Sequence, residues 1–196
     1  MILTVTLPVS LNYVLLHNKQ YMGVITIKPT YSAMLPFGGI GQVSAGYGKR
    51  DMFAPALMND ERRDGDIYTM SAGYIYPLFQ GRGMASFKYE YSVEDTDGRN
   101  WESKADRINL GILLPLRYNL HLTFSGDVFI NKYDNVHSAF DVRREDKIYS
   151  GSAGVTHELF KGLNLNLQYS QTRSDSNIAV YDYKRNVYMA GLEYNF

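Results

Sequence analysis

The stretch Leu3-Thr-Val-Thr-Leu-Pro-Val-Ser-Leu-Asn-Tyr-Val-Leu15 alternates apolar and polar residues along most of its length. Because successive side chains of a β-strand point to opposite faces, one face would carry Leu, Val and Tyr, and the other Thr, Ser and Asn. The segment therefore predicts a long amphipathic strand. Pro8 lacks the backbone N–H that pairs neighbouring strands, so we expect this strand to lie at an edge of its sheet.

The same alternation returns along the rest of the chain. Further apolar faces predict strands within residues 21–33, 40–49, 68–78, 85–93, 108–116, 120–130, 149–159, 163–169 and 188–196. About ten strands of roughly 10–13 residues are expected, longer than the ~5–6 residues usual in soluble sheets. Tilted strands of this length span about 25–30 Å, the thickness of a hydrocarbon layer. We predict one all-β domain over residues 1–196: an antiparallel up-and-down transmembrane β-barrel.

The connections alternate in length, which is an independent signal of an up-and-down barrel. Short turns are expected at residues 34–39, 79–83, 117–119 and 160–162, and long polar loops at 50–66, 95–104, 134–146 and 174–182, with 17–20 as a short member of the second set. Most charged residues fall in or beside the long loops, as expected where charge is excluded from a lipid-facing zone.

Aromatic residues collect toward both ends of the predicted strands. We expect one belt of Tyr31, Phe37, Tyr76, Phe79, Tyr118, Phe160, Tyr194 and Phe196, and a second of Tyr13, Tyr21, Tyr47, Tyr68, Tyr91, Tyr133, Tyr149, Tyr169 and Tyr188. Amphipathic rings prefer the two lipid–water boundaries. The alternative, a soluble sandwich or lipocalin-like barrel with these tyrosines in its core, is disfavoured by the long, evenly repeated strands.

Composition excludes several classes of protein. The 196 residues include 20 basic and 20 acidic side chains, so the net charge gives no general attraction to nucleic acid. The absence of Cys removes disulfides, thiolate zinc sites and thiol nucleophiles. No apolar run approaches the ~18 residues of a membrane-spanning helix.

The polar face of the predicted sheet is rich in Ser, Thr, Gly and Asn, which is typical of a confined barrel lumen. A few charges share this face. The candidate lumen-lining residues are Lys28, Lys88, Glu90, Arg107, Asp127, Glu158 and Glu193. Such opposed charges would select what passes by size and field.

The last six residues, Gly191-Leu-Glu-Tyr-Asn-Phe196, resemble the carboxy-terminal assembly signal of bacterial outer-membrane β-barrel proteins. The resemblance is carried by Gly191, Tyr194 and the terminal Phe196. It implies recognition by the barrel-assembly machinery, an outer-membrane location, short turns on the periplasmic side and long loops outside the cell. The partners implied are the lipid bilayer and lipopolysaccharide.

A narrower resemblance runs from Tyr169-Ser-Gln-Thr-Arg-Ser-Asp-Ser-Asn177 through Tyr181-Asp-Tyr-Lys-Arg-Asn186 to the terminus. It is similar to the final hairpin of barrels that follow tetratricopeptide-repeat domains, the surface lipoprotein assembly modifiers and exopolysaccharide-export porins. The chain is expected to be the carboxy-terminal part of a larger barrel rather than a complete small one.

Three functions follow from these patterns. The first is a pore or export conduit for solute, polysaccharide or protein, the second a structural or adhesive barrel with partner-binding loops, and the third an interfacial lipid-modifying enzyme. An enzyme is disfavoured because His121 and Ser125 share a face but lie about 13 Å apart along one strand. His121 with Ser86 on another strand remains as an arrangement to test, and His157 is expected to face outward.

Two loop motifs carry candidate ligands. Asp95-Thr-Asp-Gly-Arg-Asn100 has acidic spacing similar to a calcium loop but lacks the later bidentate Glu, so a solvated turn is expected and no metal or other cofactor is predicted. The mixed charges of Asp60-Glu-Arg-Arg-Asp64 and Asp141-Val-Arg-Arg-Glu-Asp146 are expected to tie loops together or to bind anionic lipopolysaccharide through Arg.

Overall fold

The computed structural model describes residues 3–195 as one antiparallel sheet with three single-turn 3₁₀ helices. The strands are β1 (Leu3–Thr6), β2 (Val9–Leu16), β3 (Lys19–Ile27), β4 (Thr30–Met34), β5 (Ile40–Met52), β6 (Gly65–Leu78), β7 (Gly83–Thr96), β8 (Ser103–Pro115), β9 (Leu120–Val136), β10 (Arg143–Phe160), β11 (Leu163–Ser176) and β12 (Tyr183–Tyr194). The 3₁₀ turns are η1 (Asn59–Glu61), η2 (Phe79–Gly81) and η3 (Ala179–Tyr181). Within the described residues no helix has the length and hydropathy to cross a membrane.

The all-β, up-and-down prediction is confirmed, but the strand count differs because two of the ten predicted strands are bent. Pro8 separates β1 from β2, and Lys28 and Pro29 separate β3 from β4. The breaks face each other, since the Lys28 N–H donates to the Pro8 carbonyl at 3.1 Å. A proline removes a ladder hydrogen bond, so the two strands change direction together at this point. Twelve strands result where the alternation of residues predicted about ten.

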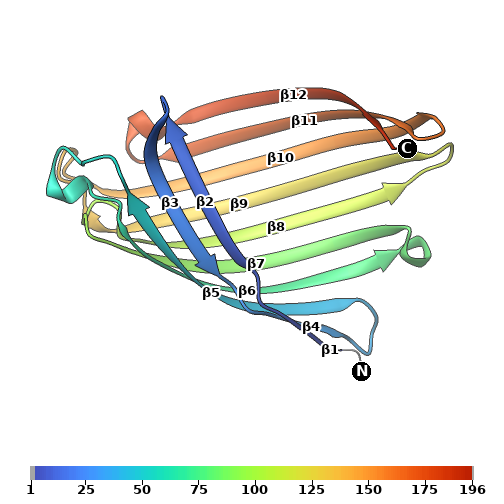
Figure 1. Ribbon diagram of the computed structural model, residues 1–196, viewed down its shortest axis with the longest axis horizontal. Coiled ribbons are helices and arrows are strands. Elements are labelled where there is room, and N and C mark those ends of the chain that lie inside the picture. Colours follow the sequence, from blue (N-terminus) through green and yellow to red (C-terminus); the bar gives the residue numbers. More distant parts are fainter. Residues whose placement is uncertain (1–2, 196) are drawn as a thin grey trace.

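Strand β5 pairs with both β3 and β4, the two parts of the second bent strand. Its first half pairs with β4 and its second half with β3, and the path then continues in sequence order from β5 to β12. The turns at the β4–β5, β6–β7, β8–β9 and β10–β11 connections lie at one end of the sheet, together with the start of β1 and the end of β12 (Figure 1). The longer loops lie at the other end, as predicted.

The sheet is not closed into a barrel. Among the described residues β12 pairs only with β11, and the opposite edge is formed by β1 and β2, which pair with β4 and β3. The predicted edge position of the strand containing Pro8 is therefore confirmed, whereas barrel closure is not seen. Figure 1 shows a strongly curved sheet, with β2 and β3 crossing the longer strands at an angle.

The register separates apolar and polar residues onto opposite faces. In the middle of the sheet Leu110 lies opposite Phe87 on β7 and opposite Gly126 on β9, while its neighbour Asn109 lies opposite Lys88 and Asp127. The apolar face is exposed: Leu110 is 56% accessible and Met70 66%. Within residues 3–195 the large side chains of this apolar face therefore do not form an interior core.

The polar face is the concave one. The Lys28 ammonium lies 2.6 Å from Glu90 on β7, although β5 and β6 separate the two strands. Three inter-strand steps of about 4.8 Å would hold perpendicular side chains about 14 Å apart on a flat sheet. Arg50 on β5 likewise reaches across β6 to Glu94 at 2.6 Å. Both contacts require a sheet that curls around its polar face.

Candidate functional site

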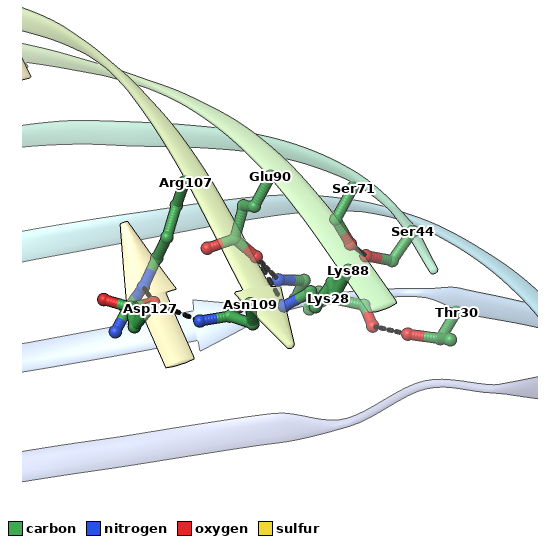
Figure 2. Close-up of polar contacts among 9 residues, drawn as sticks. All are labelled: Lys28, Thr30, Ser44, Ser71, Lys88, Glu90, Arg107, Asn109 and Asp127. Carbon is green, nitrogen blue, oxygen red and sulfur yellow. Dashed lines mark hydrogen bonds and ion pairs between the residues drawn. The ribbon is translucent and has the colours of Figure 1, made fainter. Parts of the chain in front are cut away.

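A cluster of paired charges occupies the middle of the concave face (Figure 2). Glu90 accepts hydrogen bonds from the ammonium groups of both Lys28, at 2.6 Å, and Lys88, at 2.8 Å. Strand β7 positions Lys88 and Glu90 on the same face because they are two residues apart. Three of the predicted lumen-lining charges are thus brought together.

Lys28 enters the cluster from the bend between β3 and β4. Its side chain passes over Gly46 of β5, where an added Cβ would lie 3.2 Å from the Lys28 Cγ and 2.4 Å from the Thr69 hydroxyl oxygen. Any larger residue at position 46 would therefore displace the lysine or Thr69. The absence of a side chain at Gly46 makes the long-range Lys28–Glu90 pair possible.

A second ion pair lies beside the first. The Arg107 Nε donates to Asp127 at 2.7 Å, and the side-chain amide of Asn109 also donates to Asp127. Asp127 is shielded, with 17% of its side chain accessible, whereas Arg107 is about half accessible. Asn109 is a site residue that the sequence analysis missed. Its position, two residues after Arg107 on the same face, is the signal that could have found it.

Glu158 and Glu193 do not join this cluster. Glu158 lies at the short-turn end, where it accepts hydrogen bonds from the Asn119 side chain at 2.6 Å and from the Gly162 backbone at 3.2 Å. Glu193 lies opposite Asn164 on the exposed edge strand β12. Both residues lie on the polar face, as the central charges do. They are separated from the cluster because they lie near the short-turn end of the strands, and Glu193 also lies on the edge strand.

Hydroxyl groups line the concave face beside the lysines. The Ser44 and Ser71 hydroxyls share a 2.6 Å hydrogen bond, and Thr30 donates to the Lys28 carbonyl at 3.2 Å (Figure 2). A cavity of about 450 Å³ lies over these residues, with Lys28, Lys88 and Asn109 also in its wall. The cluster therefore borders a polar recess and not a flat surface.

A second cluster forms where the long loops meet. Asn100, only 2% exposed, donates to Glu61 and to Ser138, each at 2.8 Å, and so joins three loops. Trp101 also donates to Glu61, at 3.1 Å. The expectation that the mixed-charge segments tie loops together is confirmed here for the segment 60–64.

The loop with calcium-like spacing takes part in the same packing. Asp97 pairs with Arg62 at 2.6 Å, and Thr96, which is 5% exposed, donates to the Gly98 carbonyl at 2.9 Å. The expected solvated turn is seen for Asp95, Asp97 and Arg99, which are exposed, whereas Thr96, Gly98 and Asn100 are buried against neighbouring loops. No group of three or more His, Asp or Glu residues suited to a metal ion occurs in the described chain.

Arg144 is the centre of the loop cluster. It forms a buried two-point ion pair with Asp146, at 2.6 and 3.0 Å, and its guanidinium carbon lies 3.2 Å from the ring centre of Tyr181 and 4.6 Å from that of Tyr133. Burial raises the pKa of Tyr133 to about 12, with the charge of Asp146 adding to the effect and that of Arg144 opposing it. Tyr133 lies beyond the apolar band, which ends on β9 near Ile130.

Most of the predicted belt tyrosines lie on the apolar face, but Tyr133 does not. It lies opposite Ser103 on the polar face and is 7% exposed, so its place in an aromatic belt was wrong. By contrast, Tyr47 and Tyr188 are exposed on the apolar face. The Tyr47 hydroxyl donates to Asp66 at 2.6 Å, so the ring marks the boundary between apolar and charged positions. Phe196 of the other belt lies outside the described residues.

The arrangements tested for catalysis remain apart. Ser125 shares a 2.7 Å hydrogen bond with Ser152, while His121 lies opposite Pro115 and Thr156. Ser86 lies opposite Gly111, four residues from Pro115 along β8, so about 13 Å of strand separates its row from that of His121. His157 lies on the apolar face, opposite Leu120 and Leu165, as expected.

The described part of the segment that resembles an assembly signal lies on the edge strand β12. Gly191 lies opposite Asn166 and Tyr194 opposite Leu163 at the short-turn end of β12. An added Cβ at Gly191 would meet no atom within 4 Å, so packing within this chain does not require glycine there. Phe196 again lies outside the described residues.

A family model described as "Protein of unknown function (DUF2860)" matches residues 52–195, which is more than half of the chain, and the chain therefore belongs to this family. The match begins at the end of β5 and covers all the longer strands that follow. Searches among curated proteins and among solved structures return no match to the chain.

Proposed function

We propose that this member of the DUF2860 family is a bacterial outer-membrane β-barrel protein whose concave polar face lines a pore or export conduit. The observation that carries the proposal is the exposure of the apolar face over the whole sheet. Leu11 is 74% exposed on β2, Met70 66% on β6 and Leu192 68% on β12. Continuous apolar surface of this extent is typical of sites that meet a membrane or a partner and is rare on soluble monomers.

Charged residues beyond the end of the apolar band also support a location in a membrane. On β8 and β9 the outward residues change from Ile108 and Ile130 to Lys104 and Asp134, which pair at 2.8 Å beyond the apolar band. Such a boundary fits the lipid–water interface of a transmembrane sheet. The bilayer, lipopolysaccharide and the barrel-assembly machinery are the partners that this location implies.

The transport role rests on the charge cluster of the concave face. Lys28, Lys88 and Arg107 oppose Glu90 and Asp127, so the cluster carries one excess positive charge. Charged rings in narrow pores select ions by sign, and we infer a weak preference for anions. Because this chain forms an open sheet, the conduit requires closure by a further strand, as in a larger barrel of which this chain would be the carboxy-terminal part.

Planar-bilayer recording tests this proposal. Reconstituted together with the further strand that closes its sheet, the protein should conduct, with a reversal potential in a salt gradient that indicates anion preference. Lys88→Glu should shift the preference toward cations, whereas Lys104→Glu on the outer face should leave it unchanged. Absence of current above background would refute the conduit, and equal shifts in the two variants would refute the assignment of the concave face to the pore.

The folded loop cluster favours a second candidate, a structural or adhesive barrel. Loops held together through Asn100, Glu61 and Arg144 present a fixed surface for a partner outside the cell. A protein that binds cells or matrix through these loops but carries no current would support this alternative.

A further inference from the structure

We propose that the recess beside Lys28 and Lys88 binds a small anionic ligand that also carries hydroxyl groups, the class represented by sugar acids. The inference deepens the proposed function, on which it rests in one respect: the concave face is taken as the wall that a solute meets. The recess has a volume of about 450 Å³, within the range of roughly 300–1,000 Å³ typical of small-molecule sites.

The anionic part of the ligand follows from the lysines. Each ammonium has three donors, and among residues 3–195 Lys28 and Lys88 share one side-chain acceptor, the carboxylate of Glu90. Glu90 is the most shielded of the three, with 18% of its side chain accessible against 27% for Lys28 and 42% for Lys88. The carboxylate therefore lies behind the lysines, whose remaining donors and excess positive charge face the recess.

The hydroxyl-bearing part follows from the rest of the wall. Ser44, Ser71 and Ser86 border the recess, together with Gly73. A hydroxyl donates one hydrogen bond and accepts two, so the mutual Ser44–Ser71 bond leaves acceptor sites open. A bare anion would use only the lysines, whereas a polyhydroxylated anion would use the lysines and the serines together.

The test is binding by calorimetry to the full chain folded in a detergent without a sugar headgroup, such as a lauryl amine oxide. Galacturonate is the probe, with uncharged galactose and inorganic phosphate as comparisons. We expect galacturonate to bind at least tenfold more tightly than either. Lys88→Met should weaken galacturonate binding at least tenfold, and Ser71→Ala should weaken it severalfold without affecting phosphate.

Lys104→Met is the matched control, since Lys104 is a lysine of the outer face paired with Asp134. It should bind galacturonate as the unmodified protein does, and circular dichroism would confirm that each variant retains its sheet. Equal affinity for galacturonate and phosphate would overturn the sugar-acid assignment, and unchanged binding in Lys88→Met would overturn the site. Binding without conductance would support the ligand site and refute the conduit. Conductance without binding would support the conduit and refute the ligand site.

Discussion

Replacement of Leu110 by Arg tests whether the apolar face meets lipid. Leu110 is 56% exposed, so it has few neighbours to lose. It lies five residues before Pro115, the last residue of β8, and therefore about 13 Å from the short-turn end along the axis of the proposed barrel, for a rise of ~3.3 Å per residue and a tilt near 40°. That is the middle of an apolar band ~25 Å high, where an outward Arg costs about 2–4 kcal/mol.

Val136→Arg is the matched control. Val136 is an exposed apolar residue of the outer face, but it lies 16 residues beyond Leu120 at the start of β9. By the same geometry it is roughly 40 Å from the short-turn end, outside the band, where an outward Arg costs about 0–1 kcal/mol. The difference between the two variants, and not either value alone, measures depth in the membrane.

The assay is reversible urea unfolding in phospholipid vesicles of the protein with its sheet closed by a further strand, followed by the emission of Trp101, the one tryptophan among the 196 residues. A cost of about 2–4 kcal/mol for Leu110→Arg corresponds to a 30- to 700-fold change in the folding equilibrium. An exposed position in water would change by less than about 0.5 kcal/mol. Equal and small effects in Leu110→Arg and Val136→Arg would show that the apolar face does not meet lipid.

Three further predictions concern the clusters. Gly46→Ala places a Cβ against Lys28 and Thr69 and should destabilise the fold by about 1–3 kcal/mol in the same urea assay. In the control Gly126→Ala the added Cβ meets no atom within 4 Å, so the free energy of unfolding should change little. Equal effects of the two substitutions would contradict the route of Lys28 over Gly46. Arg144→Met leaves Asp146 buried without its partner and should lower the free energy of unfolding by about 3–5 kcal/mol. The double variant Arg144→Met with Asp146→Leu should recover most of this loss. A double variant as unstable as the single one would contradict the assignment of the cost to the unpaired carboxylate. Absorbance titration should show ionisation near pH 12 that is smaller by one tyrosine in Tyr133→Phe. Because the folded pKa of Tyr133 lies above the ordinary value near 10, the stability contributed by the neutral phenol is present below about pH 10 and is lost as the pH rises toward 12. The same late ionisation in Tyr133→Phe as in the unmodified protein would refute it.

The sequence predicts the faces of the sheet well because the side-chain period of a strand is two. Once Arg107 is placed inward, Asn109 and the opposite residue Asp127 follow from the register of a hairpin. Most of the charge cluster is therefore accessible to sequence reasoning. The contact of Lys28 with Glu90 is the exception. It depends on the curvature of the sheet and on the space left at Gly46, and neither can be predicted from the local sequence pattern.

The loop cluster could be predicted only in part: the charged segments 60–64 and 141–146 were expected to tie loops together, but the contacts that Arg144 and Tyr133 make there were not. Arg144 and Tyr133 lie in segments that the sequence analysis assigned to a long polar loop and to an aromatic belt. In the structure β9 and β10 continue to Val136 and from Arg143, which carries the alternation further and turns Tyr133 inward. The end of a strand depends on its neighbours, and here the extended strands bring Tyr133 and Arg144 against Trp101 of another loop.

The apolar face and the unpaired edge impose the same requirement on the proposed function. β12 has twelve residues, and alternate residues direct their backbone groups away from β11, where the described chain offers no further strand. In hydrocarbon each unpaired backbone group costs several kcal/mol, so a sheet with such an edge cannot lie in a membrane alone. In water the edge could remain solvated, but the apolar face could not remain uncovered without promoting association. The proposed function therefore requires both a strand that pairs with β12 and a lipid environment. The strand is needed to satisfy the backbone groups of the edge, and the lipid is needed to cover the apolar face.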